Sequence, residues 1–370
     1  MAELEEKTER LVRMLAENEL DAVVLNAQHN FAWLTGGGSN GVDLSRENGV
    51  ASLMIARDGR RTIFANNIEM PRMLAEQVSG SFDPVEFSWQ NEKADGSIVL
   101  KHARQILRRD ARIATDIPMF ADTSVIEGKI APCRYRLTTE EQERFRDLGR
   151  DAGVAMGNLV GKLERGDMEV EIAEKLRHEL GKAGILSVVT LVATDERISH
   201  FRHPLPTTKR WQKTVLAVTC AKRHGLIASM SRIITIGEPD GELKRKTEAA
   251  AYVNAALLNA TRPGATGGGL YKVAADAYAA HGFAEDINRH HQGGAAGYKT
   301  RDWVAHPQNA EIVQPDQAFA WNPSITGTKV EDTTIVTADG IEIVTPSPLF
   351  PQIESIIDGR SYLSPGVLTF

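Results

Sequence analysis

Two pairs of histidines are the side chains in this sequence best suited to acid–base chemistry. His200 and His203 lie in the segment His-Phe-Arg-His-Pro, and His290 and His291 precede Gln-Gly-Gly. Imidazole titrates near neutral pH, and paired polar groups beside glycine and proline turns are typical of a lined cleft. The competing interpretation is that each is a solvated loop histidine or a satisfied core histidine, and the sequence leaves both open.

A carboxylate pair is the second candidate for proton transfer. Glu331 and Asp332 stand immediately before the apolar run 333–336, at the mouth of an expected strand. A carboxylate in that place could act as a general base. The alternative is a charge that keeps the edge of a sheet soluble.

The usual metal-binding motifs are missing from the sequence. There is no His-Glu-x-x-His and no Cys-x-x-Cys, and the expected strands 215–221 and 226–234 carry no carboxylate. A hard divalent ion needs oxygen ligands, so these strands predict a site without a bound metal and without another cofactor.

The elements that must position these residues fall into two domains. We expect a compact α/β domain over residues 1–134, with a helix over 8–19, a further helix from about residue 71, and strands over 22–25, 50–56, 61–65 and 112–115. Thr138 and Glu141 have the spacing of a capping box that opens a long helix, which places the domain boundary just before them. Residues 135–370 then mix helices (170–181 and 243–260) with strands (188–193 and 215–221), which predicts an α+β domain.

The composition of the chain indicates which binding partners and which cellular compartment to expect. The net charge of −6 is spread along the chain, so nucleic acid is not an expected partner. There are two cysteines and no apolar run of membrane-spanning length, so we expect a cytoplasmic protein without a membrane anchor.

Several segments, taken in order, resemble the creatinase, prolidase and aminopeptidase P family. The similar segments are Arg10–Leu15 with Leu20–Val24, Asn30–Gly36, Gly225–Arg232, His291–Gly294, Asn322–Pro323 and Val330–Thr333. The resemblance spans essentially the whole chain. It implies an N-terminal creatinase/prolidase-like α/β domain followed by an α+β catalytic domain of the pita-bread fold.

The resemblance also bears on the metal. The five metal-ligand positions of the family correspond here to Val218, Ser229, His291, Asn322 and Glu331. Three of these side chains cannot replace the family's carboxylates as ligands. The resemblance therefore implies the metal-free chemistry of the creatinase branch, in which the same scaffold hydrolyses a C–N bond.

Further roles follow from the same resemblance. His203 or His200 corresponds to a catalytic histidine, and Arg301 to an arginine that binds the substrate carboxylate. Arg46 resembles a second such arginine that the partner subunit contributes, which implies a homodimer with a shared site. Because the two glutamates that serve creatinase would fall at Ser231 and Asn322, creatine itself is not an expected substrate.

The function predicted on these grounds is metal-independent hydrolysis of a C–N bond, amide or amidine, in a small carboxylate-bearing molecule. His203 would act as the general acid and base, with His291 and Glu331 as further catalytic residues. Arg301, Arg46, Asn322, Ser229 and His200 would bind the substrate. The alternatives are an inactive relative that binds a peptide or small ligand, a lyase, and an Xaa-Pro-peptidase-like enzyme.

Overall fold

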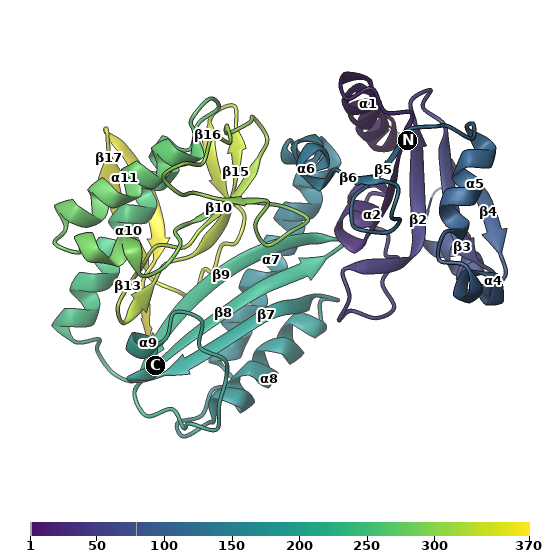
Figure 1. Ribbon diagram of the computed structural model, residues 1–370. Helices are drawn as coiled ribbons and strands as arrows, with labels where there is room; N and C mark the ends of the chain where they lie inside the picture. Colours follow the sequence, from purple (N-terminus) through teal and green to yellow (C-terminus); the bar gives the residue numbers. More distant parts are fainter. Residues whose placement is uncertain (1, 79) are drawn as a thin grey trace. The chain divides into compact units, whose positions relative to one another are not determined.

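The structure is a computed structural model that describes residues 2–78 and 80–370, and the chain divides into two compact units between Arg134 and Tyr135 (Figure 1). Each unit has its own sheet or sheets and its own helices. No helix in the described part of the chain is long and apolar enough to cross a lipid bilayer.

The N-terminal unit is built on one mixed sheet with the strand order β4-β3-β2-β1-β5-β6. The strands are β1 (Ala22–Ala27), β2 (Asn48–Ala56), β3 (Arg61–Asn66), β4 (Asp83–Phe87), β5 (Ile113–Thr115) and β6 (Ser124–Val125). The helical segments are α1 (Ala2–Glu17), α2 (Gln28–Leu34), α3 (Met70–Arg72), a π-helical turn (Met73–Gln77), α4 (Trp89–Ala94), α5 (Ile98–Ile106) and α6 (Glu127–Tyr135). The four strands expected from the sequence are all present, with ends that differ by one or two residues.

The C-terminal unit begins with two helices, α7 (Thr139–Val160) and α8 (Glu169–Gly181). The predicted capping box opens α7: the Thr138 hydroxyl accepts from the Glu141 amide at 3.2 Å, and the Glu141 carboxylate accepts from the Thr138 amide at 2.8 Å. Both helices pack against a four-stranded sheet with the order β19-β9-β8-β7. Its strands are β7 (Leu186–Thr194), β8 (Thr214–Arg223), β9 (Leu226–Thr235) and β19 (Val367–Thr369).

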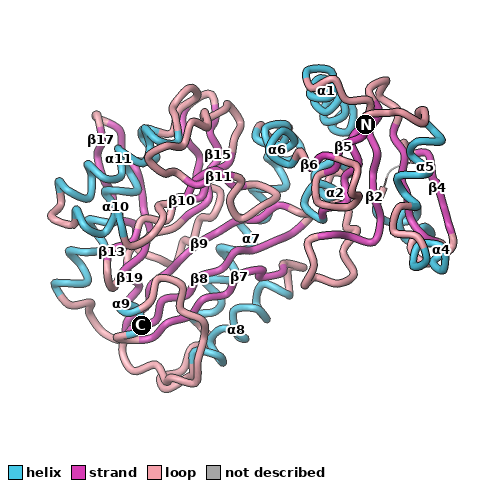
Figure 2. The backbone as a smooth tube through the Cα atoms, in the orientation of Figure 1, coloured by secondary structure: helices cyan, strands magenta, loops and turns pink. Residues whose placement is uncertain are grey.

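A second, five-stranded sheet of this unit has the order β11-β10-β12-β15-β16. Its strands are β10 (Gly293–Ala296), β11 (Trp303–Val304), β12 (Ala318–Trp321), β15 (Asp332–Thr337) and β16 (Gly340–Ile343). Figure 2 labels its strands β10, β11 and β15. The remaining elements are α9 (Arg197–His200), α10 (Gly241–Ala260), α11 (Gly267–Ala280), a 3-10 turn (Ala284–Asn288), and the hairpins β13 (Ser324–Ile325) with β14 (Thr328–Lys329) and β17 (Gln352–Ile357) with β18 (Arg360–Pro365).

The two sheets of the C-terminal unit meet where β9 passes the start of β15. Ser231 and Glu331 form an isolated antiparallel bridge there, and next to it the buried Arg232 Nη2 lies 2.7 Å from the Asp332 carboxylate. This junction brings segments 100 residues apart in sequence into direct contact, and the candidate site lies beside it.

Candidate active site

Glu331, like Asp332, is a buried acid of this junction, and it is held by three donors. Its Oε2 accepts from Ser231 Oγ at 2.5 Å and lies 2.9 Å from Lys329 Nζ, while its Oε1 accepts from Arg301 Nη2 at 3.1 Å. Burial by itself would raise the pKa of this carboxyl, but the charges of Lys329 and Arg301 outweigh it and lower the pKa to about 2. Glu331 is therefore ionised, and each of its oxygens faces a cation.

Arg301 links Glu331 to the two central strands. Its Nη1 lies 3.4 Å from Ser229 Oγ, and that hydroxyl donates to Cys220 Sγ at 3.3 Å across the β8–β9 pair. Burial raises the pKa of the Cys220 thiol, with the nearby Glu331 charge adding to the effect. The thiol is thus protonated at neutral pH and packs as a small apolar group.

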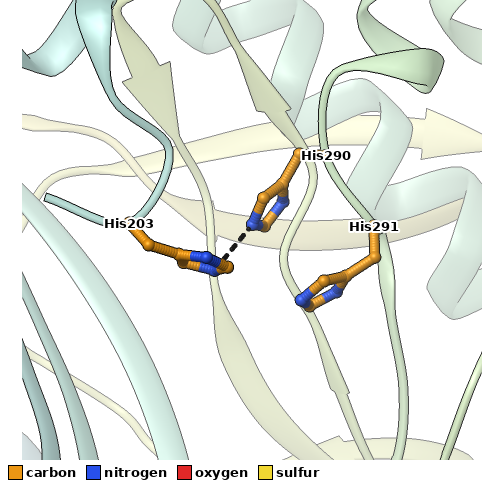
Figure 3. Close-up of side chains that lie close together, drawn as sticks. All are labelled: His203, His290 and His291. Carbon is orange, nitrogen blue, oxygen red and sulfur yellow. Dashed lines mark hydrogen bonds between the residues drawn. The ribbon is translucent and has the colours of Figure 1, made fainter.

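A histidine cluster (His203, His290 and His291) lies in the same unit (Figure 3). The Nε2 atoms of His203 and His290 are 3.1 Å apart. The rings of His290 and His291 stack with their centroids 4.4 Å apart, and the rings of His203 and His291 are 5.9 Å apart. One ring nitrogen from each residue falls within 4.8 Å of the other two.

Two anchors hold the segments that carry these rings. Arg202, the neighbour of His203, donates to Asp286 Oδ1 at 2.9 Å and to Thr326 Oγ1 at 2.8 Å. On the other segment the Gln292 amide oxygen accepts from the Tyr278 hydroxyl of α11 at 2.7 Å. All three bonds involve buried or half-buried groups, so the segments that carry the cluster are held in place.

Gly293 explains why the chain can turn into β10 directly after the cluster. Its φ is +99°, and a Cβ atom at this position would lie 2.1 Å from the Ala320 carbonyl oxygen on β12. Only glycine tolerates both the left-handed backbone and this approach.

The surroundings keep the three imidazoles neutral at pH 7. Desolvation lowers the pKa of His290 to about 2, helped by the Lys329 charge, and lowers that of His291 to about 4, helped by Arg301. The pKa of His203 is also lowered, first by burial and then by Lys329. The charges of Lys329 and Arg301 at the Glu331 junction therefore act on the imidazoles of the cluster.

The remaining expected site residues differ in where they lie. Asn322 follows β12 and is buried, with its backbone amide bonded to the Gln292 carbonyl at 3.0 Å. His200 ends α9, is exposed, and packs edge-on against Phe201 rather than joining the cluster. Arg46 lies on an exposed loop of the N-terminal unit. The structure thus places Glu331, Arg301 and Ser229 at the junction, and His203 and His291 in the histidine cluster.

Sequence reasoning overlooked Lys329 and undervalued His290. Lys329 and Glu331 are two residues apart on an extended segment, and that spacing puts both side chains on one face. The sequence marks His290 as half of a histidine pair, but the family resemblance assigns a role to His291 alone. The spacing of Lys329 was a usable signal, whereas nothing in the sequence places His290 beside His203.

The two positions that the resemblance assigns to the family's first metal ligands, Val218 and Ser229, are both part of the packing. Val218 is 2% exposed and belongs to a hydrophobic cluster with Leu216 and Ile233. Ser229 is fully buried and spans Cys220 and Arg301.

Comparisons with known proteins match both halves of the chain. The model of metallopeptidase family M24 matches residues 143–338, and the model of the creatinase/prolidase N-terminal domain matches residues 7–202. The chain is 21% identical over 358 residues to the Xaa-Pro dipeptidase of Pyrococcus furiosus, covering 92% of this chain and 98% of that protein. It is also 21% identical over 360 residues to the Xaa-Pro dipeptidase of Lactobacillus helveticus, covering 91% and 96%.

A solved structure has the same arrangement of elements. The Xaa-Pro dipeptidase from Bacillus anthracis matches with a TM-score of 0.78 at 19% identity, covering 93% of this chain and 98% of that one. Together with the family matches, this confirms the fold expected from the sequence, a creatinase/prolidase N-terminal domain followed by a pita-bread domain.

Proposed function

The chain belongs to metallopeptidase family M24, and from that premise we propose that it hydrolyses a C–N bond in a small carboxylate-bearing molecule with its own side chains in place of a dinuclear metal centre. The observation that carries the proposal is the state of Glu331. Its two oxygens, which would otherwise be free to bind metal, are paired with Lys329 and Arg301.

The residues present do not fit the family's dinuclear centre. Val218 offers no donor atom, and Ser229 and Asn322 offer only neutral oxygens where a hard or borderline cation is normally held by carboxylates. The ammonium group of Lys329 and the guanidinium group of Arg301, both beside Glu331, would also repel a pair of divalent ions. Lys329 and Arg301 thus supply fixed positive charge where the relatives' ligand set would hold metal.

Two unpartnered polar atoms indicate what the site would bind. Among the described residues, the Nε atom of Arg301 and the Oδ1 atom of Asn322 are buried without a hydrogen-bond partner. Other buried atoms of this kind occur among the described residues, and Arg301 stands out because its Nη2 already donates to Glu331. A ligand with a carboxylate and an N–H group would satisfy both, since arginine donates to carboxylates and an amide oxygen accepts from N–H.

His203 is the residue we assign to proton transfer. As a neutral imidazole it would take a proton from water, and the oxygen of that water would form a bond to the carbon of the C–N group. The same imidazolium would then return the proton to the leaving nitrogen as the C–N bond breaks. The negative charge that develops on the substrate oxygen would be stabilised by Asn322 and by the Lys329–Arg301 charges, with Glu331 and Ser229 positioning the two cations.

A second candidate is supported by the names of the relatives. Four curated relatives are named Xaa-Pro dipeptidases, and a dipeptide with C-terminal proline is itself a small molecule with a carboxylate and a C–N bond. This candidate and the first differ in whether activity needs added metal.

The test is an assay of chelator-treated protein on a panel of N-acyl amino acids, amidino acids and Xaa-Pro dipeptides. We expect turnover of at least one compound in the presence of EDTA. We also expect Lys329→Met to reduce that turnover by about 10²-fold or more, as for loss of a group that stabilises transition-state charge, and Lys329→Arg to reduce it less. Turnover that appears only after Mn²⁺, Co²⁺ or Zn²⁺ is added would overturn the metal-independent mechanism and favour the dipeptidase candidate.

A further inference from the structure

The histidine cluster brings together more imidazole than the proposed hydrolysis uses. One histidine suffices for the proton transfer, yet three ring nitrogens from two separate segments lie within 4.8 Å of one another. Figure 3 shows the three rings directed toward a common space between the segments. The role of His203 in proton transfer therefore does not explain why all three imidazoles lie together.

Hydrogen bonding does not explain the position of His290. Its Nε2 faces the Nε2 of His203 at 3.1 Å, and its Nδ1 is buried without a partner among the described residues. Within the part of the chain that the structure describes, the hydrogen bond to this ring thus comes from another histidine alone. A single proton shared between His203 and His290 is the simplest account of the short contact, but it leaves Nδ1 and the third ring unexplained.

The nitrogen positions are close to those of a metal site. Zinc binds histidine nitrogen at 2.0–2.1 Å, so three ligands in tetrahedral arrangement have nitrogens about 3.4 Å apart. The observed separations run from 3.1 Å for one pair to at most 4.8 Å for the cluster, and they bracket that value. Small rotations about the side-chain torsions would bring the three nitrogens to it.

The scaffold under the rings is already fixed. Arg202 ties the His203 segment to Asp286, and Tyr278 ties Gln292, the residue after His291, to α11. A ligand set held this way loses little conformational freedom when it binds an ion, which is a requirement for a specific site.

We propose that His203, His290 and His291 form a mononuclear Zn²⁺ site whose ligand set is distinct from the dinuclear set of the family, with only His291 in common. The nearby charges of Lys329 and Arg301 exceed that of Glu331 by one and disfavour a dication. Affinity must then come from imidazole, which selects zinc over magnesium or calcium. The fourth position stays open for water or a carboxylate.

Zinc at this site would affect the proposed hydrolysis, and this part of the inference rests on that proposed function. A zinc ion bound to His203 takes up the lone pair that would accept the proton from water. Zinc is therefore an inhibitor of the metal-free reaction, and the degree of inhibition follows the occupancy of the site.

Binding can be measured without any activity. Chelator-treated protein is titrated with ZnCl₂ by isothermal calorimetry, and with CoCl₂ by visible absorption, because tetrahedral Co²⁺ is coloured. We expect one equivalent of each ion, no heat with MgCl₂, and at least tenfold weaker binding in His203→Gln, His290→Gln and His291→Gln. The matched control is His200→Gln, three residues from His203 but outside the cluster, which should bind zinc as the wild type does.

Absence of a one-equivalent isotherm, or equal binding by the wild type and the three cluster variants, would overturn the site. The activity arm separates this result from the fate of the hydrolase. Zinc binding by a protein that turns over none of the panel leaves the site standing and removes the proposed function, whereas turnover in EDTA without zinc binding does the reverse. Activation by zinc in place of inhibition would keep the site but overturn its inhibitory role.

Discussion

At the scale of single residues, the effect of replacing His203 distinguishes an enzyme from a binding protein. A group that accepts and returns the reacting proton typically contributes about 10²–10⁴-fold to the rate, so His203→Ala should lower kcat by that factor on any substrate found in the panel. His200→Ala is the matched control and should keep kcat near the wild-type value, because His200 is exposed and outside the cluster. Thermal melts should place both variants within about 0.5 kcal/mol of the wild type.

Equal kcat for wild type and His203→Ala would remove His203 from the mechanism. Loss of activity in His200→Ala with retention in His203→Ala would transfer the role to His200.

The depressed pKa values of His290 and His291 predict how stability depends on pH. Burial lowers them to about 2 and about 4, against 6.5 for a free histidine. Below pH 6.5 the unfolded chain therefore binds protons at these histidines that the folded chain does not bind. Their contribution to the free energy of unfolding is present above pH 6.5 and is lost as the pH falls toward 4. Urea denaturation in EDTA should show that the unfolding free energy falls between pH 7 and pH 4.5. The fall should be larger in the wild type than in the double variant with His290→Gln and His291→Gln. A loss of the same size in both proteins would contradict the lowered pKa values of His290 and His291.

At the scale of elements, helix α7 carries glycines that look alike in the sequence but differ in the fold. A Cβ atom at Gly149 would lie 1.9 Å from the Val344 carbonyl oxygen, whereas one at Gly157 would meet nothing within 4 Å. Alanine is the better helix former by about 1 kcal/mol. Gly157→Ala should therefore raise the unfolding free energy by about 0.5–1 kcal/mol. Gly149→Ala should lower it by about 2 kcal/mol, because the gain in propensity is smaller than the cost of separating α7 from the 344–346 segment.

Chemical denaturation of the two variants checks the opposite signs. An increase in stability for both would mean that the close approach at Gly149 is relieved at little cost.

The same helix shows what could be predicted from sequence. The capping box of Thr138 and Glu141 and the strands around 22–25 and 215–221 depend on neighbours in the chain, and they were predicted correctly. The arrangement of Lys329, Arg301 and Glu331 depends on contacts across long separations: Glu331 meets Ser231 across 100 residues. Local spacing suggested that Glu331 stood at a strand end, but it could not show that both its oxygens are paired with cations.

The histidine cluster illustrates the same limit. His203 and His290 are separated by 87 residues, and the contact depends on Arg202 and Asp286, whose pairing has no local signature. The family resemblance supplied the roles of His203 and His291 but no role for His290. Only the folded arrangement joins His203 to His290 and His291.

At the scale of the whole molecule, the resemblance to creatinase predicts a homodimer in which each site takes Arg46 from the partner subunit. Light scattering at micromolar concentration should report twice the 40.5 kDa chain mass. Arg46→Ala should raise KM with a smaller effect on kcat, because an arginine that binds a substrate carboxylate acts mainly on affinity. A monomer under these conditions would remove the shared site altogether.

Dimers mixed from two variants test directly whether Arg46 of one subunit serves the site of the other. When Arg46→Ala and His203→Ala proteins exchange subunits, a heterodimer has one site that lacks both residues and one site that has both, provided that Arg46 acts across the interface. Random exchange makes about half of the dimers heterodimers, so the mixture should recover about one quarter of the wild-type activity, although neither parent is active at low substrate concentration. If Arg46 acts within its own chain, each site of the heterodimer lacks one residue and no activity returns. Recovery therefore depends on the origin of Arg46 alone, since both variants keep the same interface.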